Sequence, residues 1–213
     1  MNNKGILVIL SGFAGSGKGT IIRELLQKYD NYALSVSATT RAPREGEEEG
    51  VHYFFKTREE FKEMISRGEL LEYAEYVGNF YGTPRAYVKE QLSKGKNVIL
   101  EIETEGALSI KREYPDAVLI FVMPPSVEEI YNRLKHRGTE SEEVIAKRMK
   151  KAGFEISVVD RYDFLMINDV LSESVEMFNA IVSGQQMAVS RNRDYINEKK
   201  REFEEFLAGQ KEN

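Results

Sequence analysis

The sequence contains no cysteine and no tryptophan, and only two histidines and five prolines among its 213 residues. Without cysteine the chain forms no disulfide and offers no thiolate to a metal ion, which fits a reducing compartment. His52 and His136 are too few and too scattered for a zinc site. The longest apolar run, 117–123, is far too short to span a membrane, and the N-terminus does not have the pattern of a signal peptide. We therefore expect a cytoplasmic protein that does not associate with membranes.

The sequence also lacks an excess of positive charge. Its 30 basic and 35 acidic residues give a formal net charge of −5, which argues against non-specific binding to nucleic acid. Hydrophobic residues make up 41% and charged residues 31%, a balance typical of a folded globular protein rather than a disordered one. The length allows one or two domains with a sizeable core.

The most informative stretch is 6–20, ILVILSGFAGSGKGT. Residues 6–10 are apolar and rich in β-branched side chains, which predicts a buried strand of a parallel sheet. A glycine-rich loop follows, and from Thr20 onward apolar residues recur with helical spacing. Glycine lets successive backbone N–H groups turn toward an anion, and the N-terminus of the next helix adds partial positive charge. The stretch therefore predicts a phosphate-binding loop between a strand and a helix.

This loop nearly matches the motif G-x-x-x-x-G-K-[ST]. Gly19 stands where the motif has a hydroxyl, and Thr20 follows one residue later. The resulting GKGT variant is typical of nucleoside monophosphate kinases. Lys18 is expected to reach the β- and γ-phosphates of the nucleotide. The residues expected to hold ATP in this loop are Gly12, Phe13, Ala14, Gly15, Ser16, Gly17, Lys18, Gly19 and Thr20.

The segment 32–83 reads as a series of short strands inserted between α/β units. We expect strands over 32–37, 51–56 and 70–77, and a tight hairpin turn at Gly78-Asn79. The segment therefore predicts a small β-rich subdomain.

The α/β pattern resumes after this segment. Strands are expected over 98–103, 117–123 and 164–167, with helices between them. Strands that alternate with helices predict a parallel sheet covered on both faces, with ligand sites at the C-terminal ends of its strands.

Several helix starts and ends can be predicted from local signals. Pro84 is expected at the first position of a helix, with Thr83 as its cap, and Gly68 and Gly138 are expected to end two others. Three capping boxes, each a Ser or Thr followed three residues later by Glu, predict further starts: Thr57 with Glu60, Ser126 with Glu129, and Thr139 with Glu142.

A second phosphate site is predicted next to the serine- and threonine-rich stretch after position 35. Arg41 and Arg44 lie three residues apart, and two guanidinium groups are suited to binding a phosphate. Tyr53 and Tyr81 can add hydroxyl donors. Exposed loop arginines are ordinarily just solvated, but their place beside a phosphate-binding loop favours a second phosphate.

At this point the sequence resembles a known family. The stretches SVSATTRAPREGEEEGVHYFF (35–55), EYAEYVGNFYGT (72–83) and RLKHRGTESEEVIAKRM (133–149) are similar to those of the guanylate kinases, which phosphorylate GMP. The resemblance implies an α/β P-loop fold of three layers, with a central parallel sheet, a small β-rich GMP-binding subdomain (32–83) and a helical lid (133–151). It covers most of the chain, so we expect a domain over 4–185 and a C-terminal tail over 186–213.

The resemblance also implies roles for individual residues. Arg41, Arg44, Tyr53 and Tyr81 would hold the phosphate of GMP, and Ser37, Glu72 and Thr83 would read guanine. Independent chemistry supports Glu72, because guanine presents two adjacent donors, N1–H and the exocyclic amine, that one carboxylate accepts together. Without the resemblance, Glu72 would read as a solvated strand residue.

Two further acids are expected near the phosphates. Glu101 and Glu103 would project to the same side at the end of the strand 98–103. We expect Glu101, together with Thr20, to lie on the side of the Mg²⁺ ion that accompanies ATP, partly through water. Glu103 is expected to contact guanine. The family more often has Asp at the position of Glu103, so the longer side chain leaves its contact open.

The basic segment that follows is expected to close over the site. In the family, residues at the positions of Arg133, Arg137 and Arg148 approach the transferred phosphoryl group, and we count these with Lys18 and Arg41 as catalytic. A lid makes physical sense because a kinase must exclude water from a reactive phosphate. Asn168 and Asp169 follow a strand, near the place where the adenine and ribose of ATP should lie.

The reading that follows is an ATP:GMP phosphotransferase acting on GMP and dGMP in purine nucleotide metabolism, with Mg²⁺ as cofactor and ATP and GMP as its ligands. One rival is a guanylate-kinase-like binding module, but such modules lack a working phosphate-binding loop. Another is a GTPase, but we find no Asn/Thr-Lys-x-Asp guanine motif.

The tail from Arg191 has a charged helical pattern with sparse apolar residues. A solvated helix is favoured there over a self-association element. The oligomeric state, monomer or homo-oligomer, stays open.

Overall fold

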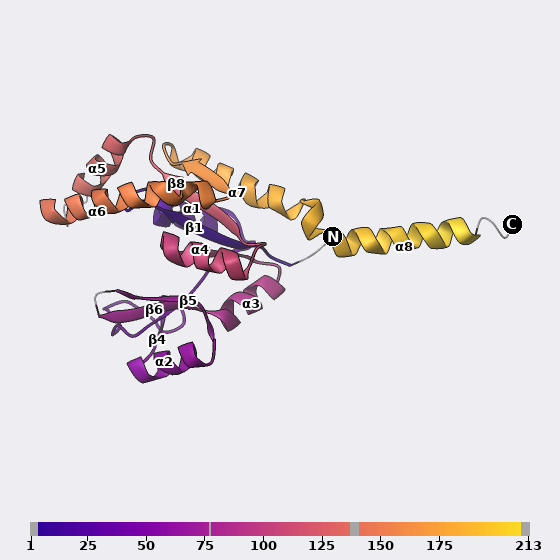
Figure 1. Cartoon of the computed structure of the whole chain (residues 1–213), viewed down its shortest axis with the longest axis horizontal. Coiled ribbons are helices and arrows are strands. Elements are labelled where there is room, and N and C mark those ends of the chain that lie inside the picture. The colour runs from indigo at the N-terminus through magenta and orange to yellow at the C-terminus, as the bar shows by residue number, and fades with distance from the viewer. Residues whose placement is uncertain (1–3, 77, 137–140, 210–213) are drawn as a thin grey trace.

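The central sheet carries the phosphate-binding loop. A computed structural model describes residues 4–76, 78–136 and 141–209, and shows five parallel strands in the order β2-β7-β1-β8-β9 (Figure 1). The strands expected from the apolar runs are present, and the last, 164–167, has the expected bounds. The strands of this sheet are β1 (Leu7–Gly12), β2 (Tyr32–Leu34), β7 (Asn97–Glu101), β8 (Val118–Met123) and β9 (Phe164–Ile167).

Helices cover both faces of this sheet because its strands are apolar on both sides. Along the first strand, Ile6, Val8 and Leu10 pack into one core cluster, while Leu7 and Ile9 pack into another. The first cluster contains side chains of α1 (Lys18–Lys28) and α7 (Leu171–Gln186), and the second those of α3 (Arg85–Ser93) and α4 (Thr104–Glu113). The expected three-layer α/β fold is confirmed.

A second sheet of four strands lies to one side of the first, below it in Figure 1. Its order is β4-β3-β6-β5, with α2 (Arg58–Ser66) packed against it through Phe61. Its strands are β3 (Ser37–Thr39), β4 (Tyr53–Phe55), β5 (Leu70–Tyr76) and β6 (Asn79–Pro84). The segment 32–83 therefore supplies all four strands of a separate small sheet, together with β2 of the central one.

The single strand expected over 32–37 is wrong, because it is two strands in two different sheets. After β2 ends at Leu34, the amide of Ser35 still donates to the carbonyl of Ile99. The chain then leaves the central sheet and enters β3 at Ser37. The alternation of side chains runs through the crossing without a break, so periodicity alone does not reveal it.

Three further expectations about element ends need correction. Glu103 is not a strand residue, because β7 ends at Glu101 and Glu103 is the N-cap of α4. Thr83 does not cap α3, because its hydroxyl donates to Glu72 and Pro84 is the N-cap. Asn79 already belongs to β6, where its backbone pairs with that of Tyr76, so it is not the turn residue that we expected.

Two of the three predicted capping pairs form hydrogen bonds in the structure. Thr57 and Glu60 make both hydrogen bonds of a capping box, and the hydroxyl of Ser126 accepts from the amide of Glu129. Helix α6 begins at Glu142 with Ser141 as its cap in place of the expected Thr139. Thr139 and Gly138 lie outside the described residues.

The remaining elements surround the loop end of the sheet and lead into the tail. Helices α5 (Val127–His136) and α6 (Glu142–Glu155) pack against Phe13 and Phe121. A short turn of helix, η1 (Ile156–Arg161), precedes β9, and another, η2 (Val189–Arg191), precedes α8 (Arg193–Gly209). The expected helical tail is present, and α8 projects away from the rest of the molecule with no side chain buried (Figure 1). Within the described ranges, no helix is long and apolar enough to cross a membrane.

Candidate active site

The loop that follows β1 is shaped by glycines that no other residue can replace without strain. Gly15 and Gly17 have φ angles of 83° and 90°, in the region that favours glycine. A Cβ atom on Gly17 would lie 2.2 Å from the side-chain nitrogen of Asn168, and one on Gly12 would lie 2.1 Å from the carbonyl oxygen of Val122. Gly17 is also the N-cap of α1, so the loop runs directly into the N-terminus of a helix. This is the backbone shape that binds a phosphate.

Lys18 lies back across this loop. Its ammonium group donates to the carbonyl oxygen of Gly12 at 2.8 Å and to that of Phe13 at 3.1 Å. The Ser16 hydroxyl is buried inside the loop with no hydrogen-bond partner within the described part of the chain. The loop therefore holds a cation and polar groups at the C-terminal edge of the central sheet.

Asn168 stabilises the loop through a hydrogen bond to its backbone. It is only 6% exposed, and its side-chain nitrogen donates to the carbonyl oxygen of Ser16 at 2.7 Å. Its side-chain oxygen accepts from the hydroxyl of Ser174 at 2.9 Å. From the sequence we expected Asn168 to lie beside the adenine and ribose of ATP. In the structure both ends of its amide are engaged within the protein, so the contact it visibly makes is with the loop.

Glu101 ends the strand next to β1, at the edge where the loop begins. In the sheet register it pairs with Leu10, and its Oε2 atom would lie 3.8 Å from a Cβ on Gly19. Although part of the side chain is accessible to water, its packing raises the pKa of this carboxyl, while the nearby Lys18 charge acts in the opposite direction. Thr20 lies in the first turn of α1, close to the same edge.

The two arginines expected to bind a second phosphate are already joined by a carboxylate. The Arg41 guanidinium donates to Oε1 of Glu47 at 2.7 Å, and the backbone amide of Arg44 donates to Oε2 at 2.7 Å. These hydrogen bonds, that from Arg41 first, lower the pKa of Glu47 to about 2. Sequence reasoning missed Glu47 because it lies in an acidic run. Its spacing, three residues after Arg44, was the available signal.

Two tyrosines complete this part of the site. Tyr53 on β4 and Tyr81 on β6 lie with their ring centroids 6.2 Å apart, in an edge-to-face arrangement. The guanidinium carbon of Arg41 lies 5.3 Å from the centre of the Tyr53 ring. The structure therefore brings Arg41, Tyr53 and Tyr81 together, as the sequence predicted.

The residues expected to read guanine also lie together. The Thr83 hydroxyl donates to Oε1 of Glu72 at 2.7 Å, across the pair β5–β6. Pairing of Ala38 with Gly82 sets Ser37 beside Thr83 on the neighbouring strand. The Glu72 carboxylate also approaches α4, because its Oε2 atom would lie 3.4 Å from a Cβ on Gly106. Burial raises the pKa of Glu72, and the hydrogen bonds from Thr83 oppose this.

Glu103 has a partner that the sequence did not reveal. Its carboxylate forms an ion pair with Lys151 on α6, and the same ammonium group lies 3.8 Å from Oε1 of Glu155. Glu155 is buried, with only 4% of its surface exposed. No local pattern predicts this group, because Glu103 and Lys151 are distant in the chain.

The lid arginines can be placed only in part. Arg133 on α5 donates to Oε1 of Glu129 at 2.7 Å, and its helix lies against the loop, since a Cβ on Gly15 would meet Leu134 at 3.4 Å. Arg148 is on α6 and half-buried. Arg137 lies outside the described residues.

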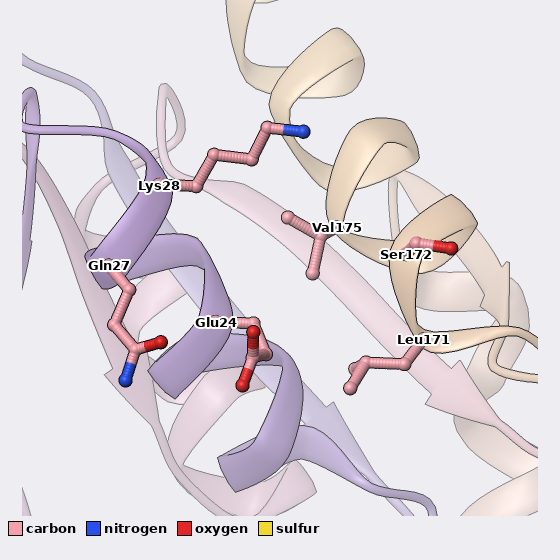
Figure 2. A pocket seen from close by; sticks show the side chains of 6 residues that line it. All are labelled: Glu24, Gln27, Lys28, Leu171, Ser172 and Val175. Atoms are coloured by element: carbon pink, nitrogen blue, oxygen red, sulfur yellow. The ribbon is translucent and has the colours of Figure 1, made fainter.

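Two hollows flank α1. One, between α1 and α7, has a volume of about 350 Å³, and Figure 2 shows the six side chains that line it. None of the predicted site residues is among them. The other, of similar volume, lies on the far side of α1 and is lined in part by Gly19 and Glu101. Its residues are Gly19, Ile22, Arg23, Leu26, Gln27, Leu34 and Glu101.

Comparison with known proteins shows the family of the chain. A protein-family model described as guanylate kinase matches residues 4–185. The chain is 50% identical over 192 residues to the guanylate kinase of Streptococcus pneumoniae, covering 90% of this chain and 92% of that one. It is 53% identical over 182 residues to the guanylate kinase of Halalkalibacterium halodurans, covering 85% and 89%. Its fold is similar to the crystal structure of guanylate kinase from Anaplasma phagocytophilum, with a TM-score of 0.69, 38% identity and coverage of 88% and 89%.

Proposed function

Because the chain belongs to the guanylate kinase family, we propose that it transfers the γ-phosphoryl group of ATP to GMP, and also to dGMP, giving ADP and the nucleoside diphosphate. The observation that carries this proposal is the presence of two cationic clusters, one beside each sheet: Lys18 in the glycine loop after β1, and Arg41 with Tyr53 and Tyr81 at the second sheet. Each cluster is suited to binding a phosphate. A phosphoryl transfer between nucleotides needs one such site for the donor and one for the acceptor.

On the donor side, the loop amides and Lys18 bind the phosphates of ATP. Lys18 now donates to two loop carbonyls, and those weak neutral acceptors are readily exchanged for phosphate oxygens, which make stronger charge-assisted hydrogen bonds. Asn168 contributes by holding the Ser16 carbonyl and so preserving the shape of the loop.

On the acceptor side, the GMP phosphate binds to Arg41, Arg44, Tyr53 and Tyr81. Glu47 holds Arg41 in position, and its negative charge must be accommodated when the phosphate arrives. Guanine then lies near Glu72, Thr83 and Ser37, with Glu103 close by at the start of α4. In the partly buried Glu72–Thr83 pair, Oε1 of the carboxylate already accepts from a hydroxyl. The other is available to a base donor, and adenine, which presents an acceptor at N1, is disfavoured.

The oxygen groups at the edge of the central sheet fit a magnesium ion bound together with ATP. Glu101 and Thr20 lie beside Gly19, and Mg²⁺ is usually bound by one or two carboxylates plus substrate phosphates and water. Within the described residues, no cluster of three or more acidic, histidine or cysteine side chains forms a metal cage, in keeping with that mode of binding. The ion would neutralise charge on the phosphates of ATP.

The transfer itself requires positioning and positive charge rather than a covalent intermediate. The acceptor oxygen belongs to a phosphate that is already anionic, so no general base is needed. We place Arg133, Arg137 and Arg148 near the phosphoryl group in the closed enzyme, with 133–151 as a lid that excludes water and 32–83 as a mobile GMP-binding subdomain. The domain 4–185 would carry all of these functions, in the cytoplasm, and the tail 186–213 none of them.

An assay that couples ADP formation to a spectroscopic signal tests the proposal directly. With ATP and Mg²⁺, GMP should be phosphorylated at least a hundredfold more efficiently than AMP, CMP or UMP, because the other bases do not offer the two adjacent donors of guanine. Equal turnover of GMP and AMP would remove the guanine-reading role of Glu72. No turnover of any nucleotide, with binding of GMP retained, would favour a binding module.

A further inference from the structure

Glu155 is a buried carboxyl group for which the proposed reaction has no use. It ends α6, is only 4% exposed, and the groups that face it come from several elements. They are Lys151 on the same helix, Glu103 at the N-cap of α4, Lys18 of the phosphate loop, and Tyr162 after η1. A buried acid is costly in its charged form, and its one close cation, Lys151, is shared with Glu103, so its presence beside the site calls for an explanation.

Lys151 is the cation that links this acid to the guanine side. Its ammonium group pairs with Oε2 of Glu103 and lies 3.8 Å from Oε1 of Glu155. The Glu103 side chain is 69% exposed and that of Glu155 only 5%, so the two carboxylates differ in their access to a ligand. One ammonium group thus stands between an accessible acid and a buried one.

We propose that Lys151 is a positioning residue that occupies Glu103 while the base site is empty and moves to Glu155 when guanine takes its place. The inference rests on the proposed role of Glu103 in guanine binding. N1–H or the exocyclic amine of the base competes with the ammonium group for the Glu103 carboxylate. Glu155 then accepts the displaced ammonium group, which keeps that charge paired with a carboxylate.

The proposed exchange of partners is coupled to the release of a proton from Glu155. With Lys151 on Glu103, burial raises the pKa of Glu155 to about 7, with the negative charge of Glu103 contributing and Lys151 and Lys18 opposing. When Lys151 moves closer and Glu103 is engaged by the base, the pKa of Glu155 falls and its proton leaves. At pH 7 about half of the molecules carry that proton, so GMP binding should release up to about half a proton from this group. GMP affinity should therefore rise with pH between about 6 and 8.

Titration calorimetry of GMP binding to the full chain, in two buffers of different ionisation enthalpy, measures this proton release. Glu155→Gln keeps the size of the side chain and should abolish the release that comes from position 155. It should also weaken GMP binding about two- to fivefold, because Lys151 loses its second partner. Proton release from the GMP phosphate itself is common to every variant and cancels in the difference.

Lys151→Met provides a second test, of whether the lysine competes with the base for Glu103. Without the competing ammonium group, GMP should bind about two- to fivefold more tightly, the factor expected for an exposed ion pair. In this background Glu155→Gln should have no further effect on the affinity for GMP. Lys150→Met, at the neighbouring exposed position of α6, is the matched control and should leave GMP affinity and proton release as in the wild type.

Two results would overturn the inference. If Lys151→Met weakened GMP binding, the lysine would be a ligand contact rather than a competitor. If Glu155→Gln lowered only the thermal stability and left proton release unchanged, Glu155 would be structural. Failure of the proposed function would look different, since the wild-type protein would then neither bind GMP nor form ADP with it.

Discussion

The two halves of the candidate site are held in place by different physical means. On the ATP side, the loop is fixed by packing and backbone geometry, since added atoms at Gly12 or Gly17 would overlap Val122 or Asn168. On the GMP side, charged and polar side chains hold one another, as in Arg41–Glu47, Glu72–Thr83 and Glu103–Lys151. Packing either accommodates a group or excludes it, whereas polar partners can be exchanged one at a time.

This difference predicts how variants should behave. Changes on the ATP side should abolish activity or leave it intact. Changes on the GMP side should give graded losses that fall mainly on the binding of GMP. The four variants below are taken from the largest expected effect to the smallest.

Lys18→Ala should reduce phosphoryl transfer below detection, because the cation that contacts the phosphates is lost while no buried side chain is removed. The thermal unfolding midpoint should change little, since the ammonium group donates to carbonyls of the loop and the side chain is not part of the core. The coupled ADP assay and a thermal melt measure both. Lys28→Ala, on the exposed end of the same helix, is the control and should keep full activity. Near-normal turnover by Lys18→Ala would refute the phosphate-loop assignment.

Glu72→Gln should reduce kcat/KM for GMP by a factor that approaches about 10⁴, because a donor then faces a donor in a partly buried site. Binding of ATP should be unchanged, since Glu72 belongs to the second sheet. Steady-state kinetics with each nucleotide varied in turn give both values. Glu75→Gln, on the same strand but exposed, should be nearly silent. Unchanged GMP turnover in Glu72→Gln would mean that guanine is read elsewhere, with Ser37 and Glu103 the next candidates.

Glu155 lies between the ATP side and the GMP side of the site, near Lys18 and Glu103, and should make the free energy of unfolding depend on pH. Burial raises the pKa of Glu155 from 4.5 to about 7, so the folded protein binds the proton more tightly than the unfolded chain. That stabilisation is complete below about pH 4.5 and is lost as the pH rises through 7, an effect of up to about 3 kcal/mol. Urea unfolding of wild type and Glu155→Gln at pH 5 and pH 8 measures it. Identical pH dependence of the two proteins would show that Glu155 ionises normally.

Arg41→Ala should raise the KM for GMP about ten- to hundredfold while the KM for ATP stays constant, since a charge-assisted pair to one phosphate is lost. Glu47→Gln should have a smaller effect in the same direction, because Arg41 keeps a hydrogen bond but loses the charge that fixes it. Initial-rate kinetics with both substrates separate these effects. A matching rise of the KM for ATP in Arg41→Ala would end the assignment of this arginine to the acceptor site.

Predictions from the sequence succeeded where the signal is local. The glycine loop, the buried apolar strand predicted at 6–10 and the capping box of Thr57 and Glu60 each depend on residues within a few positions of one another. Local backbone geometry and the burial of a strand on both faces act over such short distances, so the pattern is visible without the fold. The grouping of Arg41 with Tyr53 and Tyr81 was also predicted, from the chemistry of phosphate binding and from a family resemblance rather than from a local structural pattern.

What only the tertiary structure decided is which groups meet across the chain. The Thr83 hydroxyl donates to Glu72 instead of capping a helix, and the chain passes from one sheet to the other between β2 and β3. Glu103 is a helix N-cap instead of a strand residue, and it pairs there with Lys151. The burial of Glu155 and the pairing of Glu47 with Arg41 belong to the same class. The physical reason is that solvation and charge pairing depend on distance in space. The sequence by itself determined the elements and the phosphate loop, and the fold determined which partner each charge has.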